Sequence, residues 1–427
     1  MNCQQTLENL HRGTLDACLC ALYGKEALDD QRLRYQKALT AFAELYGKER
    51  EITIFSVPGR SELSGNHTDH NRGLAIAAAV SADVIAVASA RTDSIVTLHS
   101  EGFDPCHVDL DDFVSPRKDR YARSDALIAG VAAGLRQRGF AAGGFDAYTT
   151  SDVPRGSGLS SSAAFEVLLA QIQNHFYNAD AADATTLAKI AKYAENEFFG
   201  KPCGLLDQLA VATGGIIAID FKNAESPLIE RIDFDLNAAG YSLLIVNTGG
   251  NHADLTADYA AIPAEMHAVA KELGGEVLRD VDEIEFTLRM NELREKLGDR
   301  AVLRALHFYA ENMRVTQQKK ALEKGDLDTF FRHVIASGRS SFQFLQNVYS
   351  PSAPHEQGLS LALYTAERIV DGKGGAFRVH GGGFAGTIQL FLPTKDTGLA
   401  SMLMDGFFGR GSCMVLRVRQ VGTKIIE

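Results

Sequence analysis

The sequence contains no tryptophan and little cysteine, with six cysteines among 427 residues. The cysteines are Cys3, Cys18, Cys20, Cys106, Cys203 and Cys413. They form no Cys-x-x-Cys pair, and no histidine accompanies them at the spacing that zinc sites use. We therefore expect reduced thiols and a cytoplasmic location.

Positive charge is also in short supply, because 43 lysines and arginines stand against 54 aspartates and glutamates, for a net charge of −11. Binding to a nucleic-acid backbone depends on clustered lysine and arginine side chains that displace counterions. The charge balance therefore argues against DNA or RNA as a partner.

Apolar segments of the kind used for export or membrane insertion are lacking as well. Residues 1–10 are polar and have no apolar central segment of a signal peptide. Residues 73–90 are rich in alanine but include Ser81, Asp83 and Ser89. We predict buried strands there instead of a membrane span, and we expect no membrane partner.

The chain does have enough apolar content, 45% of its residues, to bury a sizeable core in two or three lobes. Apolar residues at three- and four-residue steps predict helices up to about residue 50. Runs of β-branched residues begin at Ile52, and a second set of strands with a long helical half begins near Gly214. We predict an α+β fold of mixed sheets with covering helices, divided into residues 1–50, 51–214 and 215–427.

Residues 154–164 read Pro-Arg-Gly-Ser-Gly-Leu-Ser-Ser-Ser-Ala-Ala and lie between a predicted strand and a predicted apolar helix. Glycines let backbone amides approach an anion, hydroxyls add donors, and the helix directs its positive end to the same point. We interpret this segment as a phosphate-binding loop. It lacks the Gly-Lys-Ser/Thr ending of a Walker A loop, and the apolar helix that follows argues against a flexible serine linker.

Residues 58–71 form a polar turn with many hydrogen-bonding side chains, which suits a polyhydroxylated ligand such as a sugar. A solvated loop whose Asp and Asn side chains cap their own turns is the alternative. His67 and His70 could bind a metal, but no further ligand accompanies them.

Asp207 follows a glycine turn in an apolar setting, where an ionised carboxylate could accept a proton from a hydroxyl. A helix cap is the alternative role. Residues 381–386 match a dinucleotide fingerprint formally, but a predicted strand follows them where that fold needs a helix, so we predict a glycine turn between two strands.

In this order the motifs resemble those of the GHMP kinase superfamily, and within it the galactokinase family, from about Ile54 to the end of the chain. The family's sugar motif, Gly-Arg-x-Asn-Leu-Ile-Gly-Glu-His-Thr-Asp-Tyr-Asn, aligns with residues 59–71. Its phosphate motif Gly-Leu-Ser-Ser-Ser-Ala is intact at residues 158–163, and residues 203–208 and 381–386 match two further motifs. The resemblance implies a two-lobed fold with the active site between the lobes.

The resemblance also implies a sugar 1-kinase that transfers the γ-phosphoryl group of ATP, with Mg²⁺, to the anomeric hydroxyl of galactose. Asp207 would be the base or charge partner of that hydroxyl, and Arg60 would lie beside the transferring phosphoryl group. The implied sugar-binding residues are Asn66, His67, Asp69, Gly204 and Tyr259. The implied nucleotide-binding residues are Gly156, Ser157, Gly158, Leu159, Ser160, Ser161, Ser162 and Ala163. The implied metal ligands are Ser161, Ser162 and Glu195.

The sugar motif departs from the family pattern at several positions. Asn66 stands where the family has a glutamate that accepts a hydrogen bond from the sugar, and Ser61, Glu62, Ser64 and His70 also differ. A kinase for another sugar, such as an amino sugar or a pentose, is therefore the alternative within the class. A sugar- and nucleotide-binding regulator without catalysis is the alternative outside it.

Overall fold

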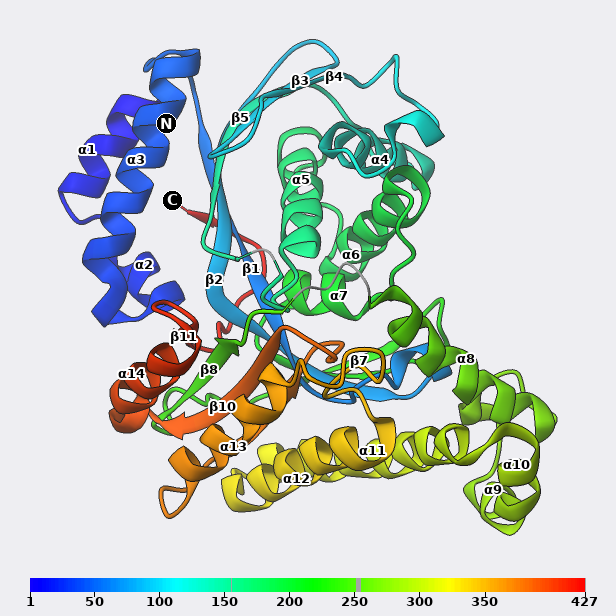
Figure 1. Ribbon diagram of the computed structural model, residues 1–427. Helices are drawn as coiled ribbons and strands as arrows, with labels where there is room; N and C mark the ends of the chain where they lie inside the picture. Colours follow the sequence, from blue (N-terminus) through cyan, green and yellow to red (C-terminus); the bar gives the residue numbers. More distant parts are fainter. Residues whose placement is uncertain (155, 251–254, 427) are drawn as a thin grey trace.

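The first fifty residues fold as three helices that pack against one face of a large sheet (Figure 1). The helices are α1 (Cys3–His11), α2 (Asp16–Tyr23) and α3 (Leu28–Tyr46). Leu39 and Phe42 of α3 share an apolar cluster with Ile54 and Val87 of the sheet. The computed structural model describes residues 1–154, 156–250 and 255–426.

The large sheet runs in the order β12-β1-β2-β5-β3-β4, and β6 and β7 extend it from the first half of β2. The strands are β1 (Thr53–Ser64), β2 (Leu74–Ala90), β3 (Ile95–Ser100), β4 (Cys106–Asp109), β5 (Phe145–Ser151), β6 (Ile216–Asp220), β7 (Leu228–Ile232) and β12 (Lys424–Ile426). Only β3 and β5 pair in parallel among the described strands. Mixed pairing confirms the predicted α+β class.

The alanine-rich segment is the long strand β2, as predicted. Its first half pairs with β6 and its second half with β5, and almost every side chain on both faces is buried. Small side chains let helices approach both faces closely. Among the residues that the structure describes, no helix has the length and apolarity needed to cross a membrane.

Four helices cover the face of the large sheet opposite to α1–α3 (Figure 1). They are α4 (Ser124–Gln137), α5 (Ser161–Asn178), α6 (Ala184–Tyr193) and α7 (Leu206–Thr213). Phe55 and Ala86 of the sheet pack with Leu168 of α5 in the main apolar cluster. Since strand neighbours alternate between faces, Ile54 and Phe55 belong to different cores.

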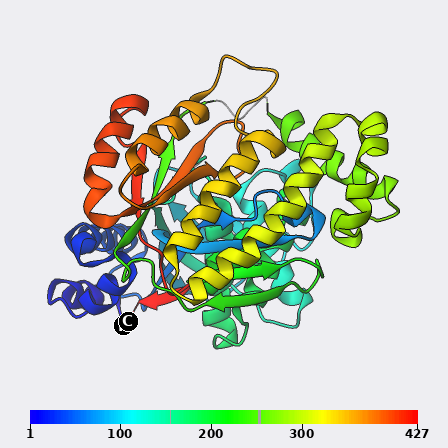
Figure 2. The same ribbon diagram turned by 90° about the horizontal axis from the view of Figure 1, so that it is seen from below.

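A second, smaller antiparallel sheet has the order β11-β8-β10-β9. Its strands are β8 (Tyr241–Asn247), β9 (Ala376–His380), β10 (Thr387–Pro393) and β11 (Cys413–Leu416). Helices α11 (Asp299–Glu323), α12 (Leu327–Ser340), α13 (Gly358–Val370) and α14 (Thr397–Phe408) accompany it. Helices α8 (Thr256–Glu272), α9 (Glu283–Leu288) and α10 (Met290–Leu297) form a side group next to one end of α11 (Figure 2).

The chain returns from its second half to complete the large sheet. Strands β6, β7 and β12 all lie beyond residue 214, and β12 pairs with β1. The two lobes therefore exchange segments, and the expected division at residue 214 stays a prediction.

Candidate active site

Asp207 and Arg60 form a two-point ion pair where α7 meets β1. Arg60 Nε donates to Asp207 Oδ1 at 2.7 Å, and Arg60 Nη2 lies 2.7 Å from Asp207 Oδ2. The Arg60 side chain is 11% exposed and that of Asp207 is 35% exposed. The carboxylate is thus held in one orientation but can still be reached from solvent.

The pKa of Asp207 lies below its ordinary value. Burial alone would raise this pKa, but the positive charge and hydrogen bonds of Arg60 and the hydroxyl of Ser160 outweigh burial. Asp207 is therefore ionised at neutral pH, as an acceptor of a hydrogen bond or proton requires.

The predicted phosphate loop enters the left-handed backbone region three times, at Gly156 (φ 71°), Gly158 (φ 70°) and Ser160 (φ 57°). Glycine adopts this conformation at no steric cost. Helix α5 begins at the next residue, so the amides of its first turn have no acceptor within the helix. These amides and the positive end of α5 favour an anion here. Arg155 of this motif lies outside the described residues.

The loop is tied to the ion pair directly. The Ser160 hydroxyl donates to Asp207 Oδ2, and Arg60 Nη1 donates to the Gly158 carbonyl. The Arg60 amide also donates to the Leu159 carbonyl at 3.0 Å. The phosphate loop, Arg60 and Asp207 therefore meet at one place.

His67 and Asp69 bring the sugar motif to the same region. His67 Nε2 lies 2.9 Å from the Gly382 carbonyl, and burial lowers the pKa of His67 to about 4, so the neutral ring donates this hydrogen bond at pH 7. Asp69 is 23% exposed. A Cβ atom on Gly204 would lie 2.8 Å from Asp69 Oδ2, so the sugar motif packs directly against the segment that leads to Asp207.

Asn66 is 1% exposed, and protein groups use its whole side-chain amide. Its Nδ2 donates to the Gly381 carbonyl at 2.7 Å and to Glu62 Oε1 at 3.2 Å. Its Oδ1 accepts from Asn347 Nδ2 at 2.8 Å and from the Ser341 hydroxyl at 3.3 Å. An amide has two donor hydrogens and two acceptor positions, so this side chain has none left for a sugar.

The glycine turn at residues 381–386 does connect two strands, β9 and β10, as predicted. Tyr259 of α8 packs on it: the Tyr259 hydroxyl donates to the Gly383 carbonyl at 2.8 Å, and its ring meets Phe384 edge-on at 5.3 Å. His380, at the end of β9, lies beneath the phosphate loop, because a Cβ on Gly158 would be 2.8 Å from His380 Nδ1. The turn therefore supports the sugar motif, and the end of β9 beside it supports the phosphate loop.

Glu195 lies in a buried polar cluster beside Asp207. Lys201 Nζ donates to Glu195 Oε1 at 2.8 Å, and Gln208 Nε2 donates to Glu195 Oε2 at 3.0 Å. Gln208 Nε2 also lies 3.4 Å from Glu166 Oε2. Burial, reinforced by the charge of Glu195, raises the pKa of Glu166 well above its ordinary value.

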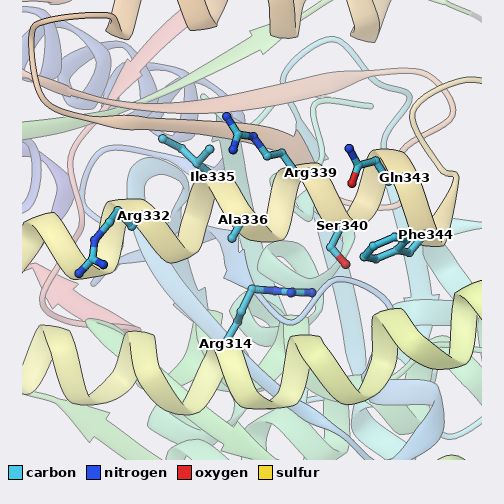
Figure 3. Close-up of a pocket in the computed structure, with 8 residues that line it drawn as sticks. All are labelled: Arg314, Arg332, Ile335, Ala336, Arg339, Ser340, Gln343 and Phe344. Atoms are coloured by element: carbon cyan, nitrogen blue, oxygen red, sulfur yellow. The ribbon is translucent and has the colours of Figure 1, made fainter. Parts of the chain in front are cut away.

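Helix α11 supports the middle of the sugar motif through Glu311. Glu311 Oε1 accepts from the Gly65 amide at 3.2 Å and from the Ser64 hydroxyl at 3.3 Å. Arg314 Nε donates to Glu311 Oε2 at 2.6 Å. Arg314 extends from α11 beneath α12, beside a hollow of about 360 Å³, where Ser340 points toward it (Figure 3). Arg314, which lines this hollow, is thus linked to the sugar motif through Glu311.

No role is predicted from the sequence for Glu62, Glu166 or His380. The predicted polar turn is wrong for residues 58–64, which continue β1, and this strand places Glu62 on the same face as Arg60 two residues before it. Glu166 follows Ser162 by four residues on a predicted helix, which also places both on one side. Nothing local in the sequence links His380 to Gly158.

Comparisons with known proteins identify the family of the chain. Residues 126–215 match the GHMP kinases N terminal domain, and residues 40–90 match the galactokinase galactose-binding signature. A galactokinase of Streptomyces coelicolor is 33% identical over 384 residues, covering 88% of this chain and 94% of its own. The galactokinase of Bos taurus is 32% identical over 401 residues, covering 92% and 96%.

Solved structures share the fold. The galactokinase of Lactococcus lactis, determined with galactose, superposes with a TM-score of 0.75 at 24% identity, covering 90% of this chain and 98% of its own. The mevalonate kinase of Methanococcus jannaschii gives a TM-score of 0.61 at 15% identity, covering 86% and 98%. From the identity and coverage of its relatives, the chain belongs to the galactokinase family of GHMP kinases.

Proposed function

We propose that the protein transfers the γ-phosphoryl group of ATP to the anomeric hydroxyl of galactose, giving galactose 1-phosphate and ADP. Relatives named galactokinase match most of the chain and support this substrate. The observation that carries the proposal is the contact of Asp207 with both Arg60 and Ser160 beside the phosphate loop. The ionised Asp207 carboxylate, the Arg60 guanidinium and the backbone amides of the phosphate loop then lie together.

Asp207 and Arg60 divide the chemistry between them. Phosphoryl transfer passes through a loose transition state, so it depends on in-line positioning and charge neutralisation more than on a strong nucleophile. Asp207 accepts the hydrogen bond of the anomeric hydroxyl and orients its oxygen toward phosphorus. As that oxygen bonds to the γ-phosphorus, the bond from this phosphorus to the β,γ-bridging oxygen breaks and ADP leaves. The proton of the hydroxyl passes to the carboxylate, while Arg60 neutralises charge on the transferring group.

The nucleotide's phosphates lie on the loop between β5 and α5. The proposed contacts come from residues that precede or begin α5, where amides lack helical acceptors. These residues are Gly156, Ser157, Gly158, Leu159, Ser160, Ser161, Ser162 and Ala163. Ser157 fixes the loop, since its hydroxyl donates to the Pro154 carbonyl at 2.7 Å.

Four of the predicted residues contact the sugar in this proposal: His67, Asp69, Gly204 and Tyr259. His67 Nδ1 is left as an acceptor when Nε2 donates to Gly382, and Asp69 offers carboxylate oxygens at the surface. Gly204 leaves room for Asp69. Asn66 contributes by fixing the loop that carries His67.

Magnesium is part of the proposal, with Ser161, Ser162 and Glu195 as candidate ligands. The residues fit a cation, because Glu166 Oε1 and Gln208 Oε1 are buried acceptors without a partner next to Glu195. Ser162 shares a side of α5 with Glu166, which favours Ser162 over Ser161. Within the described ranges no three His, Cys, Asp or Glu side chains gather as a metal site, and Mg²⁺ commonly uses one or two carboxylates with phosphate and water. When bound, the ion would supply further neutralisation of phosphate charge.

A coupled ADP-release assay across a panel of sugars tests the substrate. We expect turnover with galactose to exceed that with galactosamine, arabinose and glucose. Turnover of another sugar without turnover of galactose would overturn the galactose assignment. Binding of galactose and ATP without ADP release would favour a regulator without catalysis.

The cytoplasmic location expected from the scattered cysteines also belongs to the proposal.

A further inference from the structure

Glu62 lies on the same side of β1 as Arg60. The two residues pair with Ala77 and Ala79 of β2, and the irregularities in this ladder fall before Arg60 and after Glu62, not between them. Residues two apart on a regular strand point to the same face. The strand that presents Arg60 to Asp207 therefore presents a carboxylate beside it.

Within the described part of the chain, protein groups bond to one oxygen of that carboxylate. Glu62 Oε1 accepts from Arg378 Nη2 at 3.1 Å and from Asn66 Nδ2 at 3.2 Å. Glu62 Oε2 has no hydrogen-bond partner among the described residues and is not one of the buried atoms that lack a partner, so it meets solvent. The side chain is 14% exposed.

The charges around Glu62 are those of the candidate active site. Burial raises the pKa of Glu62 above its ordinary value, the guanidinium groups of Arg378 and Arg60 act against this rise, and the carboxylate of Asp69 adds to it. Arg60 binds Asp207 and Asp69 touches Gly204, so Glu62 borders the space where the sugar is proposed to bind.

Asn66 and Glu62 thus differ in how many of their polar side-chain atoms are bonded to protein groups. The amide of Asn66 is buried and fully bonded, whereas Glu62 Oε2 has no hydrogen-bond partner among the described residues. Relative to the sugar motif that the chain resembles, asparagine and glutamate have exchanged positions 62 and 66. Their side chains are in contact, so one carboxylate and one amide are kept within a single local network.

We propose that Glu62, and not Asn66, is the residue that recognises a sugar hydroxyl on this side of the site, through Glu62 Oε2. Arg378 and Asn66 hold Oε1 and so aim Oε2. The inference rests on the proposed function and deepens it, because it names the residue that selects a polyhydroxylated acceptor. A hydrogen bond to a charged acceptor distinguishes a hydroxyl from hydrogen at one ring position.

A comparison of the kinetic constants of wild type and Glu62→Gln tests this role. Glutamine keeps a carbonyl for Arg378 and Asn66 but puts an amide in place of the free oxygen. We expect kcat/KM for galactose to fall about 10- to 100-fold, mostly through KM, with the KM for ATP unchanged. Glu367→Gln, at an exposed site on α13, is the matched control and should behave as wild type.

Deoxygalactoses with single hydroxyls removed at C2, C3, C4 or C6 complete the comparison. The wild-type enzyme should lose activity on each deoxygalactose that lacks a hydroxyl contacted by the protein. For one of these sugars, Glu62→Gln should show a markedly smaller loss relative to its own activity on galactose. Equal penalties in both enzymes for every deoxygalactose would overturn the inference, since Glu62 then contacts none of those hydroxyls.

A crystal structure of the wild-type protein with galactose and a non-hydrolysable ATP analogue keeps the test independent of how the variant folds. We expect Glu62 Oε2 within about 3 Å of a sugar hydroxyl and Asn66 still bonded to Asn347. Galactose bound with Glu62 away from it would overturn this inference alone. A wild type that neither binds nor phosphorylates galactose would overturn the proposed function, and the inference with it.

Discussion

The Arg60 guanidinium holds the Asp207 carboxylate at two points, with nitrogen to oxygen distances of 2.7 Å for both. The geometry fixes the carboxylate before any substrate arrives, and it also keeps two opposite charges together beside the phosphate loop. Because each partner stabilises the other, removing one leaves a partly buried charge unpaired. Variants at these positions therefore need separate measurements of chemistry, binding and stability.

Asp207→Asn keeps the shape of the side chain and removes its charge. We expect kcat to fall by roughly 10²- to 10⁴-fold, since the anomeric hydroxyl loses its charged acceptor. The dissociation constant for ATP, measured by calorimetry, should change little. Joint loss of turnover and ATP binding would mean that Asp207 supports the structure of the site instead.

Arg60→Lys keeps a positive charge but cannot contact Asp207, Gly158 and a phosphate with one planar group. We expect kcat to fall about 10²- to 10³-fold, or about 3 to 4 kcal/mol, which is the scale of a lost preorganised donor. Thermal unfolding of the same variant is the control. A purely structural ion pair would lower the melting temperature and leave kcat of the folded enzyme near that of wild type.

Gly204→Ala and Gly59→Ala separate the sugar site from the phosphate loop. A Cβ on Gly204 would lie 2.8 Å from Asp69 Oδ2, the movable end of a side chain, whereas a Cβ on Gly59 would lie 2.8 Å from the backbone oxygen of Leu159. We expect Gly204→Ala to raise the KM for galactose and leave the KM for ATP unchanged. Gly59→Ala should raise the KM for ATP and lower stability. The same pattern in both variants would contradict this division.

Glu311 makes the free energy of unfolding depend on pH in the acidic range. Burial alone would raise its pKa, but the charges of Arg314 and His307 outweigh burial and lower the pKa from 4.5 to about 2. The folded state therefore binds the proton less readily than the unfolded state. The stabilisation is complete above pH 4.5, and about 3 kcal/mol of it disappears as the pH falls toward 2.

Urea unfolding at several pH values measures this effect against a matched variant. Glu311→Gln should be less stable than wild type at pH 7, because Arg314 loses its charged partner, and the two free-energy curves should converge between pH 4.5 and 2. Parallel curves over that range would show that Glu311 is not the acid-sensitive group.

The parts of the site that local sequence patterns define could be predicted. The phosphate loop is a strand, a glycine turn and a helix in direct succession, so its chemistry follows from neighbours in the chain. Asp207 could be singled out because it follows a glycine turn, but its pairing with Arg60 joins residues 147 positions apart. The family resemblance implies one active site for both residues, but no local pattern predicts this contact.

Contacts between distant segments account for what the sequence did not reveal. Glu311 supports Gly65 across 246 positions, and Asn66 meets Asn347 across 281. No helical or strand periodicity encodes such pairs. The return of β12 to β1 is of the same kind, because a strand of three residues at the chain end carries little pattern by itself. The use of Asn66 by protein groups became visible only with these partners in place.

Identification of the reaction product tests the central claim most directly. The wild-type protein is incubated with galactose, ATP and Mg²⁺, and the product is examined by ¹H and ³¹P NMR. We predict one new phosphate ester whose phosphorus couples to the anomeric proton, together with an equal amount of ADP. Phosphate on any other oxygen of the sugar, or ATP that stays intact in the presence of galactose, would contradict the account.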